Sequence, residues 1–534
     1  MAVTEVVETE RKYEVDDAAR VPELSTVAGI TEVHVESPVT LRAVYFDTEE
    51  GALASAGFTL RRREGGHDAG WHLKTPSPLG RTEHRVALES GSPRPPRELV
   101  DLVTAWTRRH SLVEVAHITT ERTAIVVFTQ DDSGANAAAA EIADDRVSAT
   151  DLRTGTLRLW REWEVESLMA EGAGNGPVLE AIGKALLDVG AVPSASHSKL
   201  ARALGRTRLD PATSASGGKN ARVSSAVPGV ADTALGAVVV ILAQLREAIL
   251  VADRGVRTHN DDAVHQMRIV VRRLRSVLAA FRGILDRDTL DALRDRLSQL
   301  GAVLGDVRDA EVRQKRAQAL VSATHTPGPH TGVETVTAVQ RRLLEDTEAE
   351  HRTLHATLID YLATHEYFAL LDDVDELVAR PPLTGTSLYD ARTALRAALH
   401  RESRRARRRV KRADRTDLSA LHRARKAARR LRYVAEALSS GESAVLGTKT
   451  RALGEAAEAV QDVLGEHRDA TLFAERLERA AEQAEHADQS AQSVQVGQLA
   501  DDYAALAAEE RQNARIAAEA LGAAVRTLTR AARA

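Results

Sequence analysis

Charged residues alternate along several short segments in the first part of this chain. Glu8, Glu10 and Lys12 occupy every second position of the segment ETERK. Alternate side chains of a β-strand point to the same face, so this spacing predicts two carboxylates and an ammonium group side by side. Such a set is costly inside an ordinary core, but it suits a site that holds a divalent cation and a phosphate.

The same alternation recurs in other segments of the first 206 residues. One strand of this kind is more often a solvated outer face. Many such strands in succession favour a hydrated interior, because FTL, WHL and IVVF leave apolar residues for a core elsewhere. The charged positions are Arg61 and Arg63, Lys74, Arg81 with Glu83 and Arg85, Arg122, Glu141 with Asp145, Glu162 with Glu164 and Glu166, and Lys199.

Two later segments repeat one basic pattern, VHQMRIVVRRLR at 264–275 and LHRARKAARRLR at 421–432. A histidine and three arginines of each segment follow the spacing i, i+3, i+7 and i+10, which is one stripe of a helix. A single arginine-rich helix is more often a solvated face, whereas the duplication favours a surface that binds a polyanion. A zinc site from His265 and His422 is less favoured, because neither has a second ligand at metal-binding spacing.

Length and composition limit the remaining choices. The chain has 534 residues and a net charge of −5, yet residues 401–432 contain fifteen Lys or Arg against three acids. The length predicts two to four domains. Cysteine is absent, which excludes disulfides, thiol catalysis and cysteine-ligated zinc and agrees with a reducing compartment. The apolar run at 237–243 is too short to span a bilayer, so we expect a cytoplasmic protein without a membrane partner.

Periodicity divides the chain into three parts. Residues 1–206 contain strand-like segments and two helical stretches, at 96–109 and 177–187, which predicts a closed or nearly closed antiparallel sheet. Residues 207–228 are rich in Gly, Ser, Ala and Pro and predict a flexible linker. Residues 229–534 have helical periodicity, and VLGDVRDA at 303–310 returns as VLGEHRDA at 463–470. The expected fold is therefore an α+β multidomain chain that ends in two related helical bundles packed as one domain.

The N-terminal segments resemble the CYTH superfamily of triphosphate tunnel enzymes, in which ETERK matches the E-x-E-x-K signature. YFDT at 45–48, LRRR, WHLK, TERT, EIADD, EVE and SK extend the resemblance over residues 1–206. It implies an antiparallel β-barrel tunnel whose basic residues hold a triphosphate and whose acids hold Mg²⁺ or Mn²⁺. EIADDRVSA departs from the family by lacking an Asp-x-Gly turn, and Arg62 adds a charge that alternation places outside.

Carried over position by position, the resemblance implies a catalytic centre at Glu8, Glu10 and Lys12. The residues expected to bind the substrate are Lys12, Arg61, Arg63, Lys74, Arg81, Arg122 and Lys199. The residues expected to bind metal are Glu8, Glu10, Glu83, Asp145, Glu164 and Glu166.

The two basic segments, with LGDVRDA and LGEHRDA, resemble the helical CHAD domain. The resemblance covers roughly 300 residues, a length typical of a domain, and implies that inorganic polyphosphate binds along a basic channel between two halves. Nucleic acid is the competing partner, but aromatic residues make up only 3% of the chain and offer few stacking platforms. The residues expected to bind polyphosphate are His265, Arg268, Arg272, Arg273, Arg275, Arg308, His422, Arg425, Lys426, Arg429, Arg430, Arg432 and Arg468.

Together these patterns predict metal-dependent hydrolysis of inorganic triphosphate, or of a related triphosphate, beside a polyphosphate-binding domain. Two alternatives stay open. The first is a polyphosphate-binding protein without catalysis, located at polyphosphate granules. The second is an adenylyl cyclase of the CYTH class, although the sequence has no motif for recognising a purine. The oligomeric state is not indicated.

Overall fold

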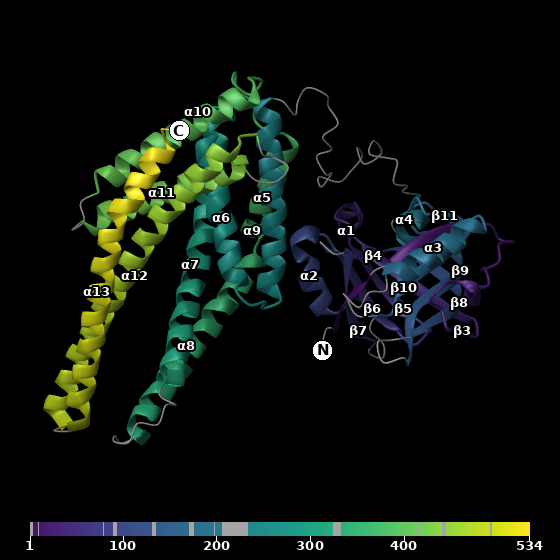
Figure 1. Cartoon of the computed structure of the whole chain (residues 1–534), viewed down its shortest axis with the longest axis horizontal. Helices are drawn as coiled ribbons and strands as arrows, with labels where there is room; N and C mark the ends of the chain where they lie inside the picture. Colours follow the sequence, from purple (N-terminus) through teal and green to yellow (C-terminus); the bar gives the residue numbers. More distant parts are fainter. Residues whose placement is uncertain are drawn as a thin grey trace. The chain divides into compact units, whose positions relative to one another are not determined.

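A computed structural model of the chain consists of two compact units, Met1–Ser224 and Ser225–Ala534 (Figure 1). It describes residues 4–8, 10–77, 80–88, 93–130, 135–169, 176–196, 198–205, 233–323, 333–413, 417–439, 445–491 and 494–533. The predicted linker at 207–228 lies outside the described residues. The predicted domain limits therefore stay predictions.

The first unit is built on an antiparallel sheet, as predicted. Its strand order is β1-β7-β6-β5-β4-β8-β9-β10-β2-β11, and β3 pairs with β8. The first two strands follow each other in the chain, yet β1 pairs with β7 and β2 pairs with β10. The strands are β1 (Thr4–Glu8), β2 (Glu10–Val15), β3 (Glu32–Val35), β4 (Val39–Asp47), β5 (Thr59–Glu64), β6 (Gly70–Ser77), β7 (Gly80–Ala87), β8 (Val113–Gln130), β9 (Asn136–Asp151), β10 (Thr156–Ser167) and β11 (Val192–Pro193).

Strand register gathers the alternating charges on one face of this sheet. Residues that stand opposite each other on paired strands share a face, and Lys12 stands opposite Glu164. Arg122 stands opposite Asp145 in the same way. The intervening residues Tyr13 and Trp163 point to the other face, where they join a buried apolar cluster.

Short helices complete the first unit. The two helical stretches predicted at 96–109 and 177–187 appear as α2 (Arg97–Thr107) and α3 (Gly176–Asp188). Leu179, Ile182 and Leu186 of α3 belong to the cluster that contains Trp163, so α3 covers the apolar face of the sheet. The remaining helices are η1 (Leu24–Thr26), α1 (Ala52–Ser55) and α4 (Lys199–Ala203).

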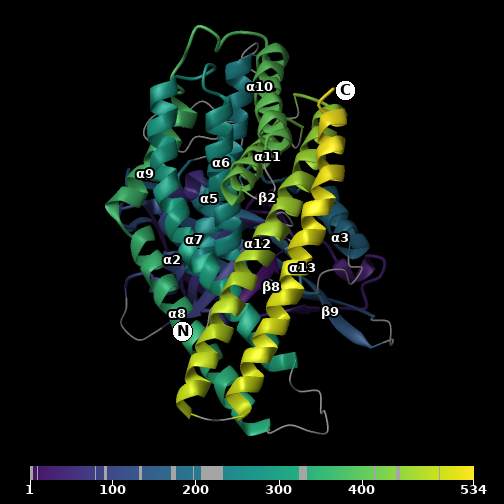
Figure 2. The ribbon, with the colours of Figure 1, turned by 90° about the vertical axis from the view of Figure 1, so that its left-hand side faces the viewer.

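The second unit is helical, as the periodicity predicts (Figure 2). The segment 264–275 lies in α6 and 421–432 lies in α11, while the two VLG motifs lie in α7 and α12. The order of basic helix and motif helix thus occurs twice, whereas a two-fold relation between the halves stays a prediction. The helices are α5 (Ala234–Arg257), α6 (Ala263–Ala280), α7 (Arg287–Ala323), α8 (Val333–Leu362), α9 (His365–Ala379), α10 (Ala391–Lys411), α11 (Leu418–Ser439), α12 (Thr448–Ala491) and α13 (Val494–Ala531).

The apolar sides of the two basic helices are fully packed. Leu274 and Val277 of α6, and Leu431 and Val434 of α11, are each 0% exposed. Because these side chains take one side of each helix, the histidine and arginine stripe is left on another side.

Helix α5 is, within the described part of the chain, the one helix long and apolar enough to cross a membrane by length and composition. Its most apolar window has a mean hydropathy of 2.0, and 56% of that window is buried in the protein. Val238, Ile241 and Leu242 are buried in this way. This burial is typical of a core helix, so a single such helix is weak evidence for a membrane span.

Candidate active site and basic helical surface

Charged side chains from β2, β5–β8, β10 and α4, and from the segment between β5 and β6, line one pocket of the first unit. The pocket encloses about 800 Å³, part of it open to solvent. It brings together all seven residues expected to bind the substrate and adds Arg85, whose signal was its place in the alternation of GRTEHRV. The eight cationic side chains are Lys12, Arg61, Arg63, Lys74, Arg81, Arg85, Arg122 and Lys199, and the four carboxylates are Glu10, Asp68, Glu164 and Glu166.

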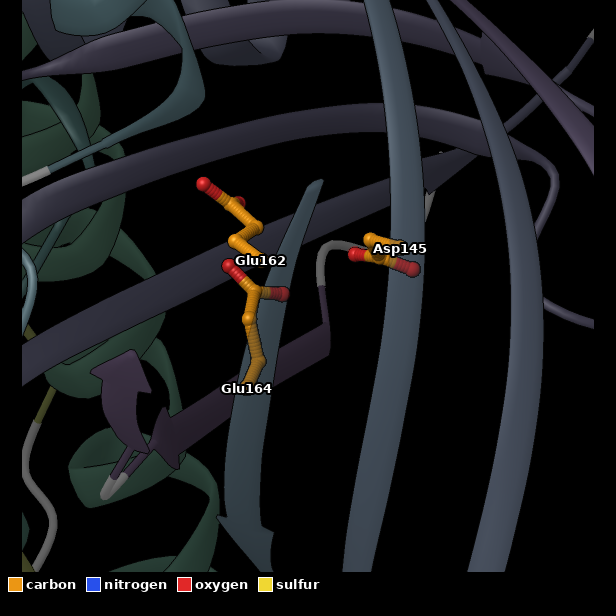
Figure 3. Close-up of side chains that lie close together, drawn as sticks. All are labelled: Asp145, Glu162 and Glu164. Atoms are coloured by element: carbon orange, nitrogen blue, oxygen red, sulfur yellow. The ribbon is translucent and has the colours of Figure 1, made fainter. Parts of the chain in front are cut away.

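Three carboxylates from two neighbouring strands form a compact cluster at this pocket (Figure 3). Oxygen atoms of Asp145, Glu162 and Glu164 lie within 4.8 Å of one another. Asp145 and Glu164 belong to the predicted metal set, whereas Glu162 was not selected from the sequence. Its signal was the alternation of Glu162, Glu164 and Glu166 along one strand. The structure therefore adds a third carboxylate to the candidate metal centre.

Cationic side chains already contact these carboxylates. The Lys199 Nζ atom lies 2.9 Å from Asp145, 2.8 Å from Glu162 and 2.7 Å from Glu164. Helix α4 fixes this lysine at its first turn, because the Ser198 hydroxyl caps the helix by accepting a bond from the Ala201 amide. Arg122 donates two bonds to Asp145, at 2.8 and 2.7 Å, and a third to Glu164 at 3.0 Å.

These ion pairs keep Glu164 and Lys199 charged. Burial raises the pKa of Glu164, but the charges of Lys12, Lys199 and Arg122 outweigh it and hold the pKa well below its usual range. Burial lowers the pKa of Lys199, but Asp145, Glu164 and Glu162 outweigh it and hold the pKa well above its usual range. Near neutral pH Glu164 is therefore an anion and Lys199 is an ammonium group.

The donor set fits a hard divalent cation. All three ligand groups are carboxylates, and oxygen ligands suit Mg²⁺ and Mn²⁺. Glu10 and Glu166 stand opposite each other on paired strands and line the same pocket, so they add donors nearby. A cation held by all three clustered carboxylates would replace the Lys199 ammonium group, which would then be free to contact an anion.

Glu83 and Glu8 are the two remaining predicted metal ligands. Glu83 is 0% exposed and is not among the pocket-lining side chains. Its carboxylate lies 3.0 Å from the His72 Nδ1 atom, 3.6 Å from Arg61 and 3.8 Å from Lys74. These contacts favour a role in positioning the cationic side chains. Glu8 lies in β1 opposite Arg81, but its side chain is outside the described residues.

The arginine part of the pocket brings like charges together, although Arg63 also pairs with Asp68 and Arg61 lies 3.6 Å from Glu83. Burial, together with repulsion from Arg61 and Arg122, lowers the pKa of Arg63 to about 9. A bound anion would relieve this repulsion. Arg62, which lies between Arg61 and Arg63 in the sequence, instead pairs with Glu64 at 2.7 Å and does not line the pocket, as strand alternation predicts.

In the second unit, α6 and α11 bring like charges together. Burial lowers the pKa of Arg272 to about 9, and repulsion from Arg429 and Arg268 contributes to this shift. Arg268 contacts Asp309 at 3.2 Å. Within the described parts of the chain, no ion pair engages Arg272, Arg425 or Arg429. Clustered arginines without acids are typical of a site for an anion.

Other predicted polyphosphate ligands are bound to acids of the protein itself. Arg273 and Arg432 both pair with Glu436, and Arg430 pairs with Glu402. Arg308 similarly pairs with Asp262 and Glu311, at 3.1 and 2.9 Å. The structure thus separates this paired group from the clustered arginines, a distinction that the shared spacing of the basic segments conceals.

Comparison with known proteins agrees with both halves of this description. Residues 7–154 match the CYTH domain and residues 240–478 match the CHAD domain. "Uncharacterized protein Rv2226" of Mycobacterium tuberculosis is 33% identical over 488 residues, which cover 88% of each chain.

The chain belongs to the family that joins a CYTH domain to a C-terminal CHAD domain.

Two solved structures are similar to part of it. "PptA from Streptomyces chartreusis" is 21% identical, with a TM-score of 0.40, over 55% of this chain and 99% of that one. The CHAD domain from the plant Ricinus communis is 25% identical, with a TM-score of 0.39, over 55% of this chain and 93% of that one.

In the CHAD domain, the glycines of the repeated VLG motifs make room for the basic helices. A β-carbon on Gly465 would lie 2.8 Å from the Arg425 Nη2 atom, and one on Gly305 would lie 3.9 Å from the Arg268 Nη2 atom. Each glycine thus faces the arginine three residues after the motif histidine. A β-carbon at position 465 would therefore require the end of the Arg425 side chain to move.

The two motif histidines of the CHAD domain lie among cations. Burial lowers the pKa of His265, and Arg308 lowers it further. Burial, Lys426 and Arg468 lower the pKa of His422. Together with Arg425, His467 and Arg468, His422 lines a pocket of about 920 Å³, part of it open to solvent, in which Arg468 donates to the His422 Nδ1 atom at 3.2 Å. Both histidines are therefore neutral near pH 7 and able to gain a proton beside an anion.

Proposed function

We propose that the CYTH domain hydrolyses inorganic triphosphate, or a related triphosphate, with Mg²⁺ or Mn²⁺ at its carboxylates. We also propose that the CHAD domain binds inorganic polyphosphate. The observation that carries the first proposal is the pocket with eight cationic and four acidic side chains beside the Asp145, Glu162 and Glu164 cluster. A closed tunnel belongs to this proposal, and the pairing of β1 with β7 and of β2 with β10 supports it.

The two parts of the pocket suit the two needs of phosphoryl transfer. Such a reaction requires mainly alignment of the phosphoryl group and neutralisation of its charge. Arg61 and Arg63 would hold phosphate oxygens, and arginine does so with paired donors. A divalent cation at the carboxylates would neutralise phosphate charge and favour the hydroxide form of the attacking water. Lys12, which contacts Glu10 at 3.2 Å and also Glu164, would lie where both parts meet.

The polyphosphate proposal rests on the arginine cluster of α6 and α11. Arg272 and Arg429 repel each other where no acid compensates them within the described residues. A chain of phosphates supplies closely spaced anions that match this arrangement. A CHAD domain tethered to the CYTH domain would also raise the local concentration of phosphate chains near the pocket. The absence of cysteine fits the cytoplasmic location, or location at polyphosphate granules, that we propose.

The pocket gives less support to an adenylyl cyclase. Such an enzyme must seat a purine, and the one aromatic side chain among the residues lining the pocket is Tyr45. A polyphosphate-binding protein with an inactive pocket is the other alternative. Activity measurements distinguish all three.

The first experiment is phosphate release from tripolyphosphate, thiamine triphosphate and ATP, each with Mg²⁺ or Mn²⁺. Glu164→Gln is compared with Glu121→Gln, which changes an exposed glutamate on β8. The double variant Arg61→Gln/Arg63→Gln is compared with Arg62→Gln. We expect losses of about a hundred-fold or more in the pocket variants and about two-fold or less in the controls. Absence of phosphate release by the unmodified protein, or equal losses in controls, would overturn the enzyme proposal.

The second experiment measures polyphosphate affinity of the full chain. Arg272→Gln/Arg429→Gln is compared with Arg287→Gln/Arg380→Gln, two arginines that are 72% and 74% exposed. The first pair should weaken binding about ten-fold or more while tripolyphosphate turnover stays within about two-fold. If Arg272→Gln/Arg429→Gln is folded and binds polyphosphate as tightly as the unmodified protein, the arginines of α6 and α11 form a solvated surface and not a polyphosphate site.

A further inference from the structure

Helix α10 carries another stripe of arginines, which lies outside the two repeated basic segments. Its members are exposed. With about 100° between successive helical residues, they fall on one side of the helix, while Leu395, Glu402, Ala406 and Val410 are buried on the other. The α10 stripe consists of Arg401, Arg404, Arg405, Arg408 and Arg412.

The α10 stripe has no acidic partners in the part of the chain that the structure describes. Helix α5, which precedes the other basic helix, differs in this respect. Its Arg246 pairs with Asp375 at 2.7 Å, and its Arg257 pairs with Asp253 at 2.6 Å. The two halves of the CHAD domain therefore differ, because Arg246 and Arg257 of α5 are paired with acids, whereas the α10 stripe has no such pairs within the described residues.

A line of neighbouring arginines connects the stripe to the α6 and α11 cluster. Arg430 of α11 pairs with Glu402 of α10 and donates to the Ala279 carbonyl of α6 at 2.8 Å, so it lies where the three helices meet. Burial lowers the pKa of Arg430 to about 10; Glu402 opposes this shift, while Arg405 and Arg294 add to it.

The same kind of repulsion continues toward the clustered arginines. Burial and then Arg294 lower the pKa of Arg275. Burial lowers the pKa of Arg429, and Arg275 is one of the neighbouring cations that add to this. A series of neighbouring arginines therefore extends from Arg429 to Arg405, in which Arg294 and Arg430 are also paired with Asp291 and Glu402.

We infer that the polyphosphate site of the CHAD domain continues from α6 and α11 onto the α10 stripe, so that this protein prefers long polyphosphate chains. The inference rests on the proposed polyphosphate binding. From Arg401 to Arg412 the stripe runs eleven residues, which is about 16 Å along a helix. A short chain fills the α6 and α11 cluster, and a longer one also gains contacts with the stripe.

The surroundings favour a phosphate chain over nucleic acid. Arg272 and Arg429 are only partly exposed between helices, and a thin flexible chain can contact both these groups and the exposed stripe. A rigid duplex is too wide to do so, since its major groove alone measures about 12 Å across. Helix α10 has no Phe, Tyr or Trp on which single-stranded bases could stack.

The test measures affinity of the full chain for two polyphosphate fractions of narrow length distribution, one short and one long, at one salt concentration. The stripe variant is Arg405→Gln/Arg408→Gln. Its matched control is Arg392→Gln/Arg396→Gln, which removes the same charge from exposed positions of the same helix on another side. We expect the stripe variant to bind the long fraction about ten-fold more weakly and the short fraction within about two-fold of the unmodified protein. The control should match the unmodified protein for both fractions.

Loss of affinity that is equal for both fractions, or no loss for either, would overturn the inference while leaving polyphosphate binding itself intact. A variant that loses affinity for duplex DNA but keeps affinity for long polyphosphate would also overturn it, by assigning the stripe to nucleic acid. If the unmodified protein binds neither fraction, the proposed function of the CHAD domain fails first.

Discussion

Replacement of Lys199 by glutamine should convert the carboxylate cluster from an ion-paired site into one that depends on metal for stability. The Lys199 Nζ atom contacts Asp145, Glu162 and Glu164 at 2.7 to 2.9 Å, and these groups are almost entirely buried. Glutamine removes the positive charge but keeps a polar side chain. The three carboxylates then repel one another within 4.8 Å.

The size of the effect follows from this geometry. Removing one partner of a buried ion pair costs about 3 to 5 kcal/mol. Arg122 still contacts Asp145 and Glu164, so we expect a loss near the lower limit, about 3 kcal/mol. A divalent cation at a hundred times its dissociation constant stabilises the folded state by about 2.7 kcal/mol. The variant should therefore regain most of its stability in Mg²⁺ or Mn²⁺, and the unmodified protein should gain less, because the cation must replace an ammonium group.

Tryptophan fluorescence makes this measurable without interference from the CHAD domain. All four tryptophans, Trp71, Trp106, Trp160 and Trp163, lie in the first unit. Urea unfolding would be followed with chelator and with each metal, using Lys184→Gln on the exposed side of α3 as the matched control. If metal stabilises variant, control and unmodified protein equally, or stabilises none of them, the assignment of a metal site to these carboxylates is refuted.

Three further predictions concern the CHAD domain. Gly465→Ala should lower polyphosphate affinity about three-fold or more, because the new β-carbon displaces Arg425. The same change should stabilise the helix by up to about 1 kcal/mol. Gly305→Ala, whose β-carbon would make an ordinary 3.9 Å contact, is the control and should keep its affinity. A bound anion raises the lowered pKa values of His265 and His422, so polyphosphate affinity should rise as the pH falls from about 8 to about 6. In calorimetric titrations, the affinity of His265→Gln/His422→Gln should depend less on pH. An unchanged pH dependence would exclude these histidines as its cause. Burial lowers the pKa of His355 to about 4, with His259 and His351 contributing. The unfolded chain therefore binds a proton that the folded chain does not, and the free energy of unfolding should fall by up to about 3 kcal/mol as the pH drops from about 6.5 to about 4. Unfolding of His355→Leu, followed by far-ultraviolet circular dichroism, should show a smaller fall, and an equal fall would contradict this role of His355.

Sequence periodicity was sufficient to predict the antiparallel sheet and the helical second half, and the resemblance of the motifs predicted the family of both domains. The period of two in the strands decided which charges share a face, because Lys12 and Glu164 could be assigned to that face before their pairing was known. The two helical stretches of the first unit were also predicted. The closed tunnel and the two-fold repeat stay predictions, as do the roles of the site residues.

The burial of individual charged side chains and the identity of their ion-pair partners could not be predicted, because both depend on contacts between residues distant in the sequence. Glu83 is enclosed because the register of β6 and β7 places it opposite Lys74 and beside His72. Arg272 and Arg273 are neighbours in the sequence, yet Arg273 meets Glu436 of another helix. One helical segment therefore contains both a candidate ligand site and a structural ion pair, and only the packing of α6 with α11 separates them.

The most direct test of the central claim is phosphorus NMR of tripolyphosphate incubated with the unmodified full chain and Mg²⁺ or Mn²⁺. We expect tripolyphosphate to disappear and pyrophosphate and orthophosphate to appear in equal amounts. Tripolyphosphate that stays intact with either metal, while ATP is converted to cyclic AMP and pyrophosphate or is likewise unchanged, would contradict it.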